Sequence, residues 1–322
     1  MSSNQKISMV HIGLMKTATT TLQNLWLQDT RVSLVHKGLL QIIQKARVTG
    51  RSAKSGAAVP LQWQYDSKPE PGQHIVLSQE ALSTAYINER ASKADIKRFQ
   101  KAAAKILSMI VPSPKILITV REPASWIKSI YNQSVKMGGI DTFPDFLKME
   151  KDFIKQSLNI VDLKETWGEF FGKENILVLP IELMRNNKAL FFEEIFKFSG
   201  VPVPDLTVEI AANPSMKEEH LKLMKRFNEW VDIFTRYGIY QRQIPQQVQQ
   251  ALNIIRFAVR YSLESPSAEL LEKVADTESR LPDCDIDLSH IDSEFLSKIR
   301  VSYQKVLIDN DFYGFRDLYC GQ

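Results

Sequence analysis

The architecture of this chain can be predicted from residues 7–22, which read Ile7-Ser8-Met9-Val10-His11-Ile12-Gly13-Leu14-Met15-Lys16-Thr17-Ala18-Thr19-Thr20-Thr21-Leu22. Residues 7–14 are mostly apolar, which is typical of a short strand buried on both faces of a parallel sheet. Leu22, Leu25 and Trp26 then recur at helical spacing. A strand, a turn of small residues and a helix in this order direct backbone N–H groups toward a phosphate. The segment therefore predicts a phosphate-binding loop around Lys16.

The order of residues in this loop differs from that of a Walker A loop, where Gly-x-x-x-x-Gly-Lys-Ser/Thr places the lysine late. Lys16 comes first here, and the run Lys16-Thr17-Ala18-Thr19-Thr20 resembles the 5′-phosphosulfate loop of the sulfotransferase family, K-S/T-G-T-T/S. Members of that family use 3′-phosphoadenosine 5′-phosphosulfate (PAPS) as the sulfuryl donor. On the residues alone, an ordinary strand-to-helix turn with a solvated lysine is the alternative. Ala18 replaces the usual glycine, which requires either a backbone without positive φ or some strain.

Further apolar runs alternate with helical patterns along the chain. We expect strands at 32–39, 74–78, 115–120 and 175–180, helices at 92–110, 124–137 and 189–198, one or two helices within 143–171, a long and partly loop-like excursion at 41–71, and helices at 218–234, 245–263 and 293–308.

This alternation predicts an α/β fold with a central parallel sheet flanked by helices, the P-loop-like fold of sulfotransferases, followed by a helical C-terminal extension. We expect a single domain over 1–322, with a PAPS-binding α/β core at 1–200 and a mainly helical remainder at 201–322. No Pro-, Gly- or Ser-rich linker marks a boundary between the two parts.

A second motif follows the most apolar of the predicted strands and reads Arg121-Glu122-Pro123-Ala124-Ser125-Trp126-Ile127-Lys128-Ser129-Ile130-Tyr131. An arginine at the carboxyl end of a strand, next to a helix start, is well placed to hold a phosphate. The pattern resembles the R-x-P…S-x-Y segment of sulfotransferases, which implies that Arg121 and Ser129 bind the 3′-phosphate of the nucleotide. In the alternative, Arg121 pairs with Glu122 and Ser129 faces solvent.

The same strand end argues against a metal-dependent kinase. P-loop kinases and ATPases usually place an Asp at the end of a core strand to hold Mg²⁺. The best candidate strand here ends in Val120-Arg121 instead. The resemblance implies no metal cofactor.

A general base is expected soon after the strand at 74–78. The family resemblance places a His or Glu in this region, and Glu80 is the best candidate by position. Sulfation of a hydroxyl requires a base to accept its proton, and a carboxylate with a raised pKa is suited to this. His11, His74 and Glu182 are the reserve candidates, and a capping or ion-pairing role is the alternative for Glu80.

The resemblance gives Lys16 a catalytic role at the oxygen between sulfate and the 5′-phosphate, where negative charge develops. Backbone amides of Thr17, Ala18, Thr19 and Thr20, with the hydroxyls of Thr19, Thr20 and Thr21, are expected to hold the 5′-phosphate.

Composition and charge limit the classes of function, partner and location that remain. The chain has 322 residues and a net charge of +4 with both signs mixed, so no nucleic-acid partner is expected. Cys284 and Cys320 are far apart and fit neither a disulfide framework nor a metal site. No apolar run fits a signal peptide or a membrane span, which predicts a cytoplasmic protein of the soluble, bacterial type.

The sequence therefore predicts in-line sulfuryl transfer from PAPS to a hydroxyl, or as second choice an amine, of a small-molecule or carbohydrate acceptor. A P-loop-type nucleotide phosphotransferase and a non-catalytic nucleotide-binding module are the alternatives. The acceptor and the oligomeric state are left open.

Overall fold

The computed structural model describes residues 7–36, 39–51, 69–84, 96–111, 113–208, 216–240, 246–264, 286–307 and 315–320. The chain divides into two compact units. The first contains Met1–Trp126, Asp152–Ala212 and Asp292–Gln322, and the second contains Ile127–Lys151 and Asn213–Ile291. The predicted boundary at residue 200 is not the division between these units, and the single domain remains a prediction.

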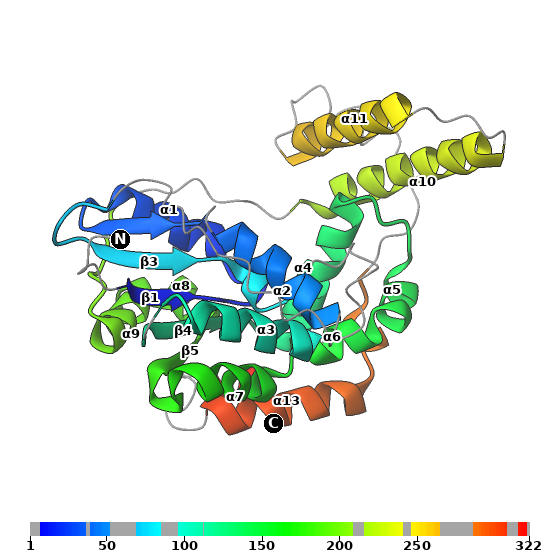
Figure 1. The fold of residues 1–322 in the computed structure, drawn as a ribbon. Coiled ribbons are helices and arrows are strands. Elements are labelled where there is room, and N and C mark those ends of the chain that lie inside the picture. The colour runs from blue at the N-terminus through cyan, green and yellow to red at the C-terminus, as the bar shows by residue number, and fades with distance from the viewer. Residues whose placement is uncertain are drawn as a thin grey trace. The chain divides into compact units, whose positions relative to one another are not determined.

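The first unit is built on a sheet of five parallel strands in the order β2-β3-β1-β4-β5, with helices on both sides (Figure 1). The sheet and its flanking helices confirm the predicted α/β fold. The strands are β1 (Ile7–His11), β2 (Val32–Val35), β3 (His74–Ser78), β4 (Lys115–Val120) and β5 (Ile176–Pro180). β1 pairs with β3 on one side and β4 on the other. The chain thus reverses its direction of winding at β1, where ligands of open α/β sheets bind.

The helices of this unit bury the two faces of the sheet. On one face, α1 (Thr19–Gln28), α8 (Ile181–Asn186) and α9 (Lys188–Ser199) share a core with the strands. Trp26, Leu117 and Phe191 belong to this core and are fully buried. A second set packs α3 (Ile96–Ser108) between α2 (Leu40–Arg51) and α7 (Ile160–Phe171), and α7 also contacts α13 (Ser293–Leu307), which contacts α14 (Arg316–Cys320). Short 3₁₀ segments among the described residues include Glu80–Leu82 and Lys173–Asn175 in this unit and Leu288–His290 in the second unit.

The second unit contains α4 (Pro123–Lys136) from Ile127 onward, α5 (Phe143–Met149), α10 (Glu218–Tyr240) and α11 (Gln246–Glu264). The Tyr131 ring packs edge-on against Phe143 and Phe146, with ring centroids 5.2 and 5.4 Å away. The Asn228 side chain on α10 donates to the carbonyl oxygens of Val135 and Gly139 at 2.7 and 3.0 Å. It therefore holds the turn that ends α4.

Two predictions of local structure need correction. Residues 143–171 form three helices, α5, α6 (Lys151–Ser157) and α7, instead of one or two. A side-chain cap marks the boundary between α6 and α7, where Asn159 accepts from the N–H of Asp162, and another marks the start of α5, where Thr142 accepts from the N–H of Asp145. The expected excursion at 41–71 begins as helix α2, and its residues 52–68 lie outside the described part of the chain.

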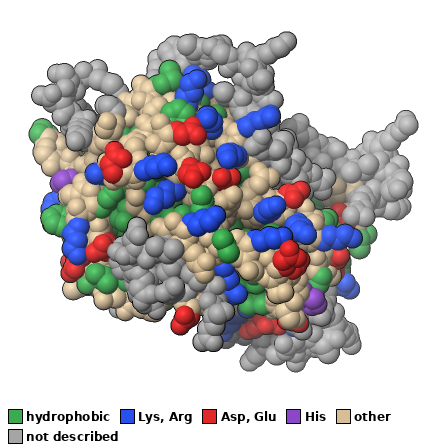
Figure 2. Space-filling view, turned by 90° about the horizontal axis from the view of Figure 1, so that it is seen from below, with side chains coloured by type: hydrophobic (Ala, Val, Ile, Leu, Met, Phe, Trp, Pro, Cys, Tyr) green, Lys and Arg blue, Asp and Glu red, His purple; other side chains and the backbone are tan. Residues whose placement is uncertain are grey.

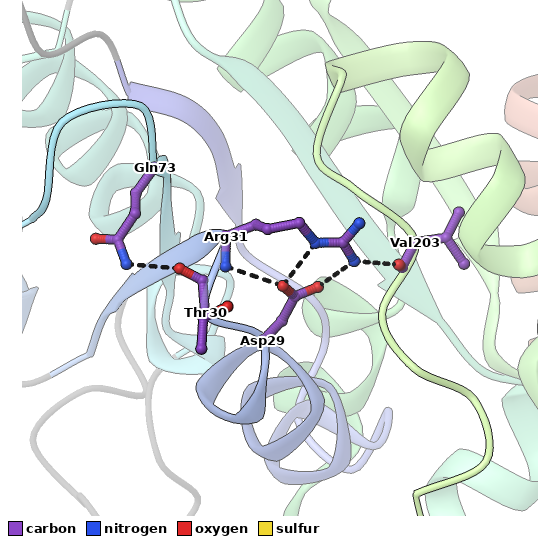
Figure 3. Close-up of polar contacts among 5 residues, drawn as sticks. All are labelled: Asp29, Thr30, Arg31, Gln73 and Val203. Atoms are coloured by element: carbon purple, nitrogen blue, oxygen red, sulfur yellow. Dashed lines mark hydrogen bonds and ion pairs between the residues drawn. The ribbon is translucent and has the colours of Figure 1, made fainter.

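An ion pair holds the turn between α1 and β2 (Figure 3). The Arg31 guanidinium donates to both carboxylate oxygens of Asp29, at 2.8 and 2.7 Å, and to the carbonyl oxygen of Val203 at 2.7 Å. Gln73 donates to the carbonyl oxygen of Thr30 at 2.8 Å. The contacts lower the pKa of Asp29, chiefly through its hydrogen bond with Arg31. They connect three chain segments beside the sheet.

Charged side chains of both signs are interspersed on the face of the molecule in Figure 2. Surface ion pairs include Lys97–Asp162 at 3.3 Å and Lys101–Glu169 at 2.8 Å, which connect α3 to α7. Exposed pairs of this kind contribute little stability each.

A row of buried polar side chains connects the carboxyl ends of β3, β1 and β4. His11 is fully buried, with Nδ1 hydrogen-bonded to the Ser78 hydroxyl at 2.9 Å and Nε2 to the Thr119 hydroxyl at 3.0 Å. The Thr119 hydroxyl also bonds that of Thr17 at 2.8 Å. Burial lowers the pKa of His11 to about 3, so the imidazole is neutral and one ring nitrogen donates while the other accepts. These bonds attach the segment around Lys16 to the sheet.

Gly13 makes room for this row. A Cβ atom at residue 13 would lie 1.9 Å from Thr119 Oγ1, 2.7 Å from His11 Nε2 and 2.9 Å from Thr17 Oγ1. The Thr119 hydroxyl cannot rotate away without losing its two side-chain hydrogen bonds. Glycine is therefore needed here for space.

We predict that Gly13→Ala lowers the free energy of unfolding by about 1–3 kcal/mol, the usual range for overpacking. Thr119→Ala removes the most crowded atom, so the Gly13→Ala/Thr119→Ala pair should lose less stability than the two single changes added together. Urea unfolding of the four proteins measures this coupling. Additive losses would contradict the packing described for Gly13.

Candidate nucleotide-binding site

The three middle strands bring three predicted functional residues to one edge of the sheet. Lys16 follows β1, Glu80 follows β3 and Arg121 follows β4, and these strands are adjacent and parallel. Their carboxyl ends lie at the topological switch point of the sheet, where ligands bind in this class of fold. The structure thus places together residues that are up to 105 positions apart in the chain.

The carbonyl oxygens of the Lys16 loop are held by the surrounding protein. The Ser83 hydroxyl donates to Gly13 O (2.9 Å), the Thr17 hydroxyl to Leu14 O (2.5 Å), the Trp126 indole to Met15 O (2.7 Å) and Arg121 Nη1 to Lys16 O (3.5 Å). Trp126 and Thr17 are fully buried, so these donors are fixed by packing. With the carbonyls directed into the protein, the loop is suited to present N–H groups to an anion.

The loop backbone is left-handed at two non-glycine residues. Lys16 has φ 64° and Ala18 has φ 57°, and Ala18 is the residue just before α1. A left-handed conformation costs an L-residue roughly 1–2 kcal/mol. Of the two possibilities stated for alanine in place of the family's glycine, the structure has the strained one. Strain of this kind is held by surrounding contacts and is common at binding sites.

The threonines of the loop have different environments. The Thr17 hydroxyl is occupied within the protein, whereas Thr20 is exposed and Thr21 is half-buried. Thr19 opens α1, and its buried hydroxyl lies beside the Glu80 carboxyl, whose pKa it lowers.

Arg121 is half-buried against the loop. Its Nε is buried, and no hydrogen-bond partner for that atom lies among the described residues. Burial lowers the pKa of Arg121, and so does the charge of Arg185, while Glu182 and Glu122 raise it. An arginine remains protonated under such perturbations. Arg121 therefore provides a fixed positive charge with an unused donor.

Glu122 has a different role from the one in the alternative interpretation. Its two carboxylate oxygens accept from the N–H groups of Ala124 and Ser125 at 2.9 and 2.6 Å. This is an N-terminal cap of α4, where a negative charge is also favourable. Ser129 is half-buried further along α4, in the second unit, and its contact with a nucleotide stays a prediction.

Glu80 opens the 3₁₀ segment after β3. Burial raises its pKa above the ordinary 4.5, and four groups oppose this: the Thr19 hydroxyl, the charge and backbone N–H of Lys16, and the charge of His36. The carboxyl is thus close to the lysine of the loop. A buried carboxyl with a raised pKa beside a cation is the arrangement expected of a general base.

The reserve candidates are less suited to proton transfer. Both ring nitrogens of His11 are occupied, and its pKa is about 3. His74 is the first residue of β3, so it lies at the amino ends of the strands, whereas Lys16 lies at their carboxyl ends. The Glu182 carboxylate accepts from the N–H of Glu122 and from the Tyr319 hydroxyl.

The sequence patterns did not identify two further residues near the carboxyl ends of the strands. His36 follows β2, and its Nδ1 lies 3.0 Å from Gln23 Nε2 and 3.2 Å from the Ser78 carbonyl oxygen. Gln23 on α1 also donates to that carbonyl oxygen at 3.1 Å. His36 falls inside the strand expected at 32–39, which ends at Val35 in the structure, so the sequence did not single it out, and Gln23 lies on a helix with no motif.

No protein-family model matches this chain, and none of the curated proteins matches it in sequence. Among solved structures, a sulfotransferase from Alicyclobacillus acidocaldarius is similar, with a TM-score of 0.47 and 14% sequence identity. The match covers 76% of this chain and 99% of that chain. This is a likeness between folds.

Two searches of the described residues bear on the other sequence predictions. Among the helices of the described ranges, none combines the length and apolar character that crossing a membrane requires. Within the same ranges, no group of three or more His, Cys, Asp or Glu side chains is arranged to hold a metal ion.

The raised pKa of Glu80 leads to a prediction about stability and pH. A carboxyl whose pKa is higher in the folded protein than in the unfolded chain makes folding less favourable as the pH rises through the folded value. Glu80→Gln removes this penalty. We therefore predict that the stability of the variant relative to wild type is greater at about pH 8 than at about pH 4.

Urea unfolding at the two pH values is the measurement. Glu193→Gln on α9, an exposed position, is the matched control and should change stability little at either pH. If Glu80→Gln destabilises the protein more at the higher pH, the burial described for this carboxyl is wrong.

Proposed function

We propose that this protein is a sulfotransferase that moves a sulfuryl group from PAPS to an acceptor hydroxyl. The observation that carries the proposal is the convergence of Lys16, Glu80 and Arg121 at the carboxyl ends of β1, β3 and β4. A loop with fixed carbonyls, a buried carboxyl and a half-buried arginine are the three groups that this reaction uses. The proposal also draws on the resemblance of the Lys16 and Arg121 motifs to those of the family.

The donor nucleotide carries one phosphate at the 5′ position and another at the 3′ position of its ribose. In this proposal, the backbone amides of 17–20 and the hydroxyls of Thr19, Thr20 and Thr21 hold the 5′-phosphate, with Lys16 beside it. Arg121 and Ser129 hold the 3′-phosphate. The buried Arg121 Nε, which has no hydrogen-bond partner among the described residues, supports this assignment, since a charge-assisted hydrogen bond to phosphate would satisfy it.

The reaction breaks the bond between sulfur and the bridging oxygen of the donor and forms a bond between sulfur and the acceptor oxygen. The products are a sulfate ester and adenosine 3′,5′-bisphosphate, with the acceptor's proton taken up by the base. Lys16 is proposed to stabilise the charge that develops on the bridging oxygen, a contact stronger in the transition state than in the ground state.

Glu80 is proposed as the base. Its ionised form is disfavoured by burial and favoured by Lys16, so the carboxylate has raised basicity while the lysine keeps it close to the reacting centre. The acceptor is proposed to be a small molecule or carbohydrate that presents a hydroxyl, with an amine as second choice. The protein is proposed to act in the cytoplasm without a metal cofactor.

Thermal unfolding with adenosine 3′,5′-bisphosphate, in the absence of metal, tests the nucleotide site. At about 100 times its dissociation constant the ligand should stabilise the wild type by about 2.7 kcal/mol. Arg121→Ala should lose most of this effect. Lys105→Ala removes an exposed cation from the last turn of α3 and should keep it.

The other outcomes separate the alternatives. No stabilisation at millimolar ligand would contradict the proposal, and stabilisation by ATP only with Mg²⁺ would favour a phosphotransferase. Binding of the bisphosphate without sulfate transfer to any acceptor of a broad hydroxyl and amine panel would favour a binding module.

A further inference from the structure

Two buried tyrosines from the C-terminal end of the chain lie behind Arg121. Tyr303 is on α13 and Tyr319 is on α14, and both belong to the same compact unit as the sheet. Both side chains are fully buried, with ring centroids 5.4 Å apart. Neither tyrosine belongs to a motif recognised in the sequence. A buried tyrosine hydroxyl requires a partner, so the contacts of these hydroxyls show what the pair does.

Each hydroxyl contacts either the backbone at the carboxyl end of β4 or Glu182, a side chain that bonds that backbone. Tyr303 donates to the carbonyl oxygen of Arg121 at 3.3 Å. Tyr319 bonds the Glu182 carboxylate and lies 3.5 Å from the carbonyl oxygen of Val120. The C-terminal segment therefore holds the carbonyl group of Arg121 through Tyr303 and contacts Glu182 through Tyr319.

Glu182 extends the contact to the start of α4. While one of its oxygens bonds Tyr319, the other accepts from the N–H of Glu122 at 3.2 Å. The Glu122 carboxylate in turn caps α4 through Ala124 and Ser125. Arg121 and Glu122 thus each have one backbone group fixed by this buried network.

The network is suited to working over a broad pH range. Burial raises the pKa of both tyrosines well above the ordinary value of 10, and the negative charge of Glu182 raises it further. The hydroxyls therefore stay protonated and continue to donate. A buried carboxylate such as Glu182 requires these donors, because an ionised group without partners is strongly destabilising.

We infer that Tyr319 and Tyr303 are positioning residues that set the Arg121 guanidinium for an anionic ligand, specifically for the 3′-phosphate of an adenosine nucleotide. The identity of the ligand rests on the proposed function, whereas the positioning rests on the contacts above. The C-terminal segment thereby becomes part of the specificity for a 3′-phosphorylated nucleotide, although it contributes no group that touches it.

The experiment compares two ligands that differ only in the 3′-phosphate, adenosine 3′,5′-bisphosphate and adenosine 5′-phosphate. Isothermal titration gives the ratio of their dissociation constants for wild type, Tyr319→Phe and Tyr303→Phe. We expect the preference for the bisphosphate to fall about five- to tenfold in Tyr319→Phe, since one hydrogen bond to a charged group is lost. A general loss of stability would weaken both ligands alike and leave the ratio unchanged.

Tyr261→Phe is the matched control. It removes the hydroxyl of an exposed tyrosine on α11, which belongs neither to the Arg121–Tyr131 motif nor to the buried network. Its ratio should equal that of the wild type. If Tyr319→Phe fails to fold, Tyr303→Phe provides the same comparison, because its hydroxyl contacts Arg121 directly.

Hydrogen exchange without ligand separates this inference from the proposed function. The amides of Glu122, Ala124 and Ser125 should exchange faster in Tyr319→Phe than in wild type and Tyr261→Phe. If the wild type binds the bisphosphate but the ratio is unchanged in both tyrosine variants, the inference is overturned and the function stands. If the wild type binds neither nucleotide, the proposed function fails, and unchanged exchange would then overturn the positioning as well.

Discussion

The hydrogen bonds that hold the carbonyl oxygens of residues 13–16 are the constraint on which the site depends. Three of the donors come from other parts of the chain, Ser83 after β3, Trp126 on α4 and Arg121 after β4, and the fourth, Thr17, lies within the loop. Each donor is itself positioned by the sheet or its helices. The loop can therefore keep left-handed residues at Lys16 and Ala18 that a free peptide would avoid.

The same contacts connect the backbone conformation of the Lys16 loop to the positions of the charged side chains around it. Arg121 both supports the loop and faces the site, so its cation cannot move without affecting Lys16. Glu80 is buried beside this lysine, and its pKa is raised because burial outweighs the attraction. The row through Ser78, His11 and Thr119 joins the three strand ends from below the loop. The loop backbone, the positive charges of Lys16 and Arg121 and the proposed proton acceptor Glu80 thus belong to one hydrogen-bonded structure.

Local patterns in the sequence were sufficient for the strands, the parallel sheet and the proximity of Lys16, Glu80 and Arg121. Strand ends of a parallel sheet share one edge, so position along the chain predicts position in space. What the pattern missed depends on distant partners. His11 is a central buried contact because Ser78 and Thr119 lie beside it, and Tyr319 reaches Glu182 across 137 positions of the chain. The boundary between α6 and α7 is marked by a side-chain cap that periodicity does not detect.

The central claim is that the N–H side of the Lys16 loop binds the 5′-phosphate of a nucleotide. NMR of protein labelled with ¹⁵N-threonine reports on the amides of Thr17, Thr19, Thr20 and Thr21 together, with Thr166 on α7 as an internal reference. Titration with adenosine 3′,5′-bisphosphate should shift the loop amides strongly and saturably and move Thr166 little. Saturable binding that leaves the four loop amides unmoved would contradict the account.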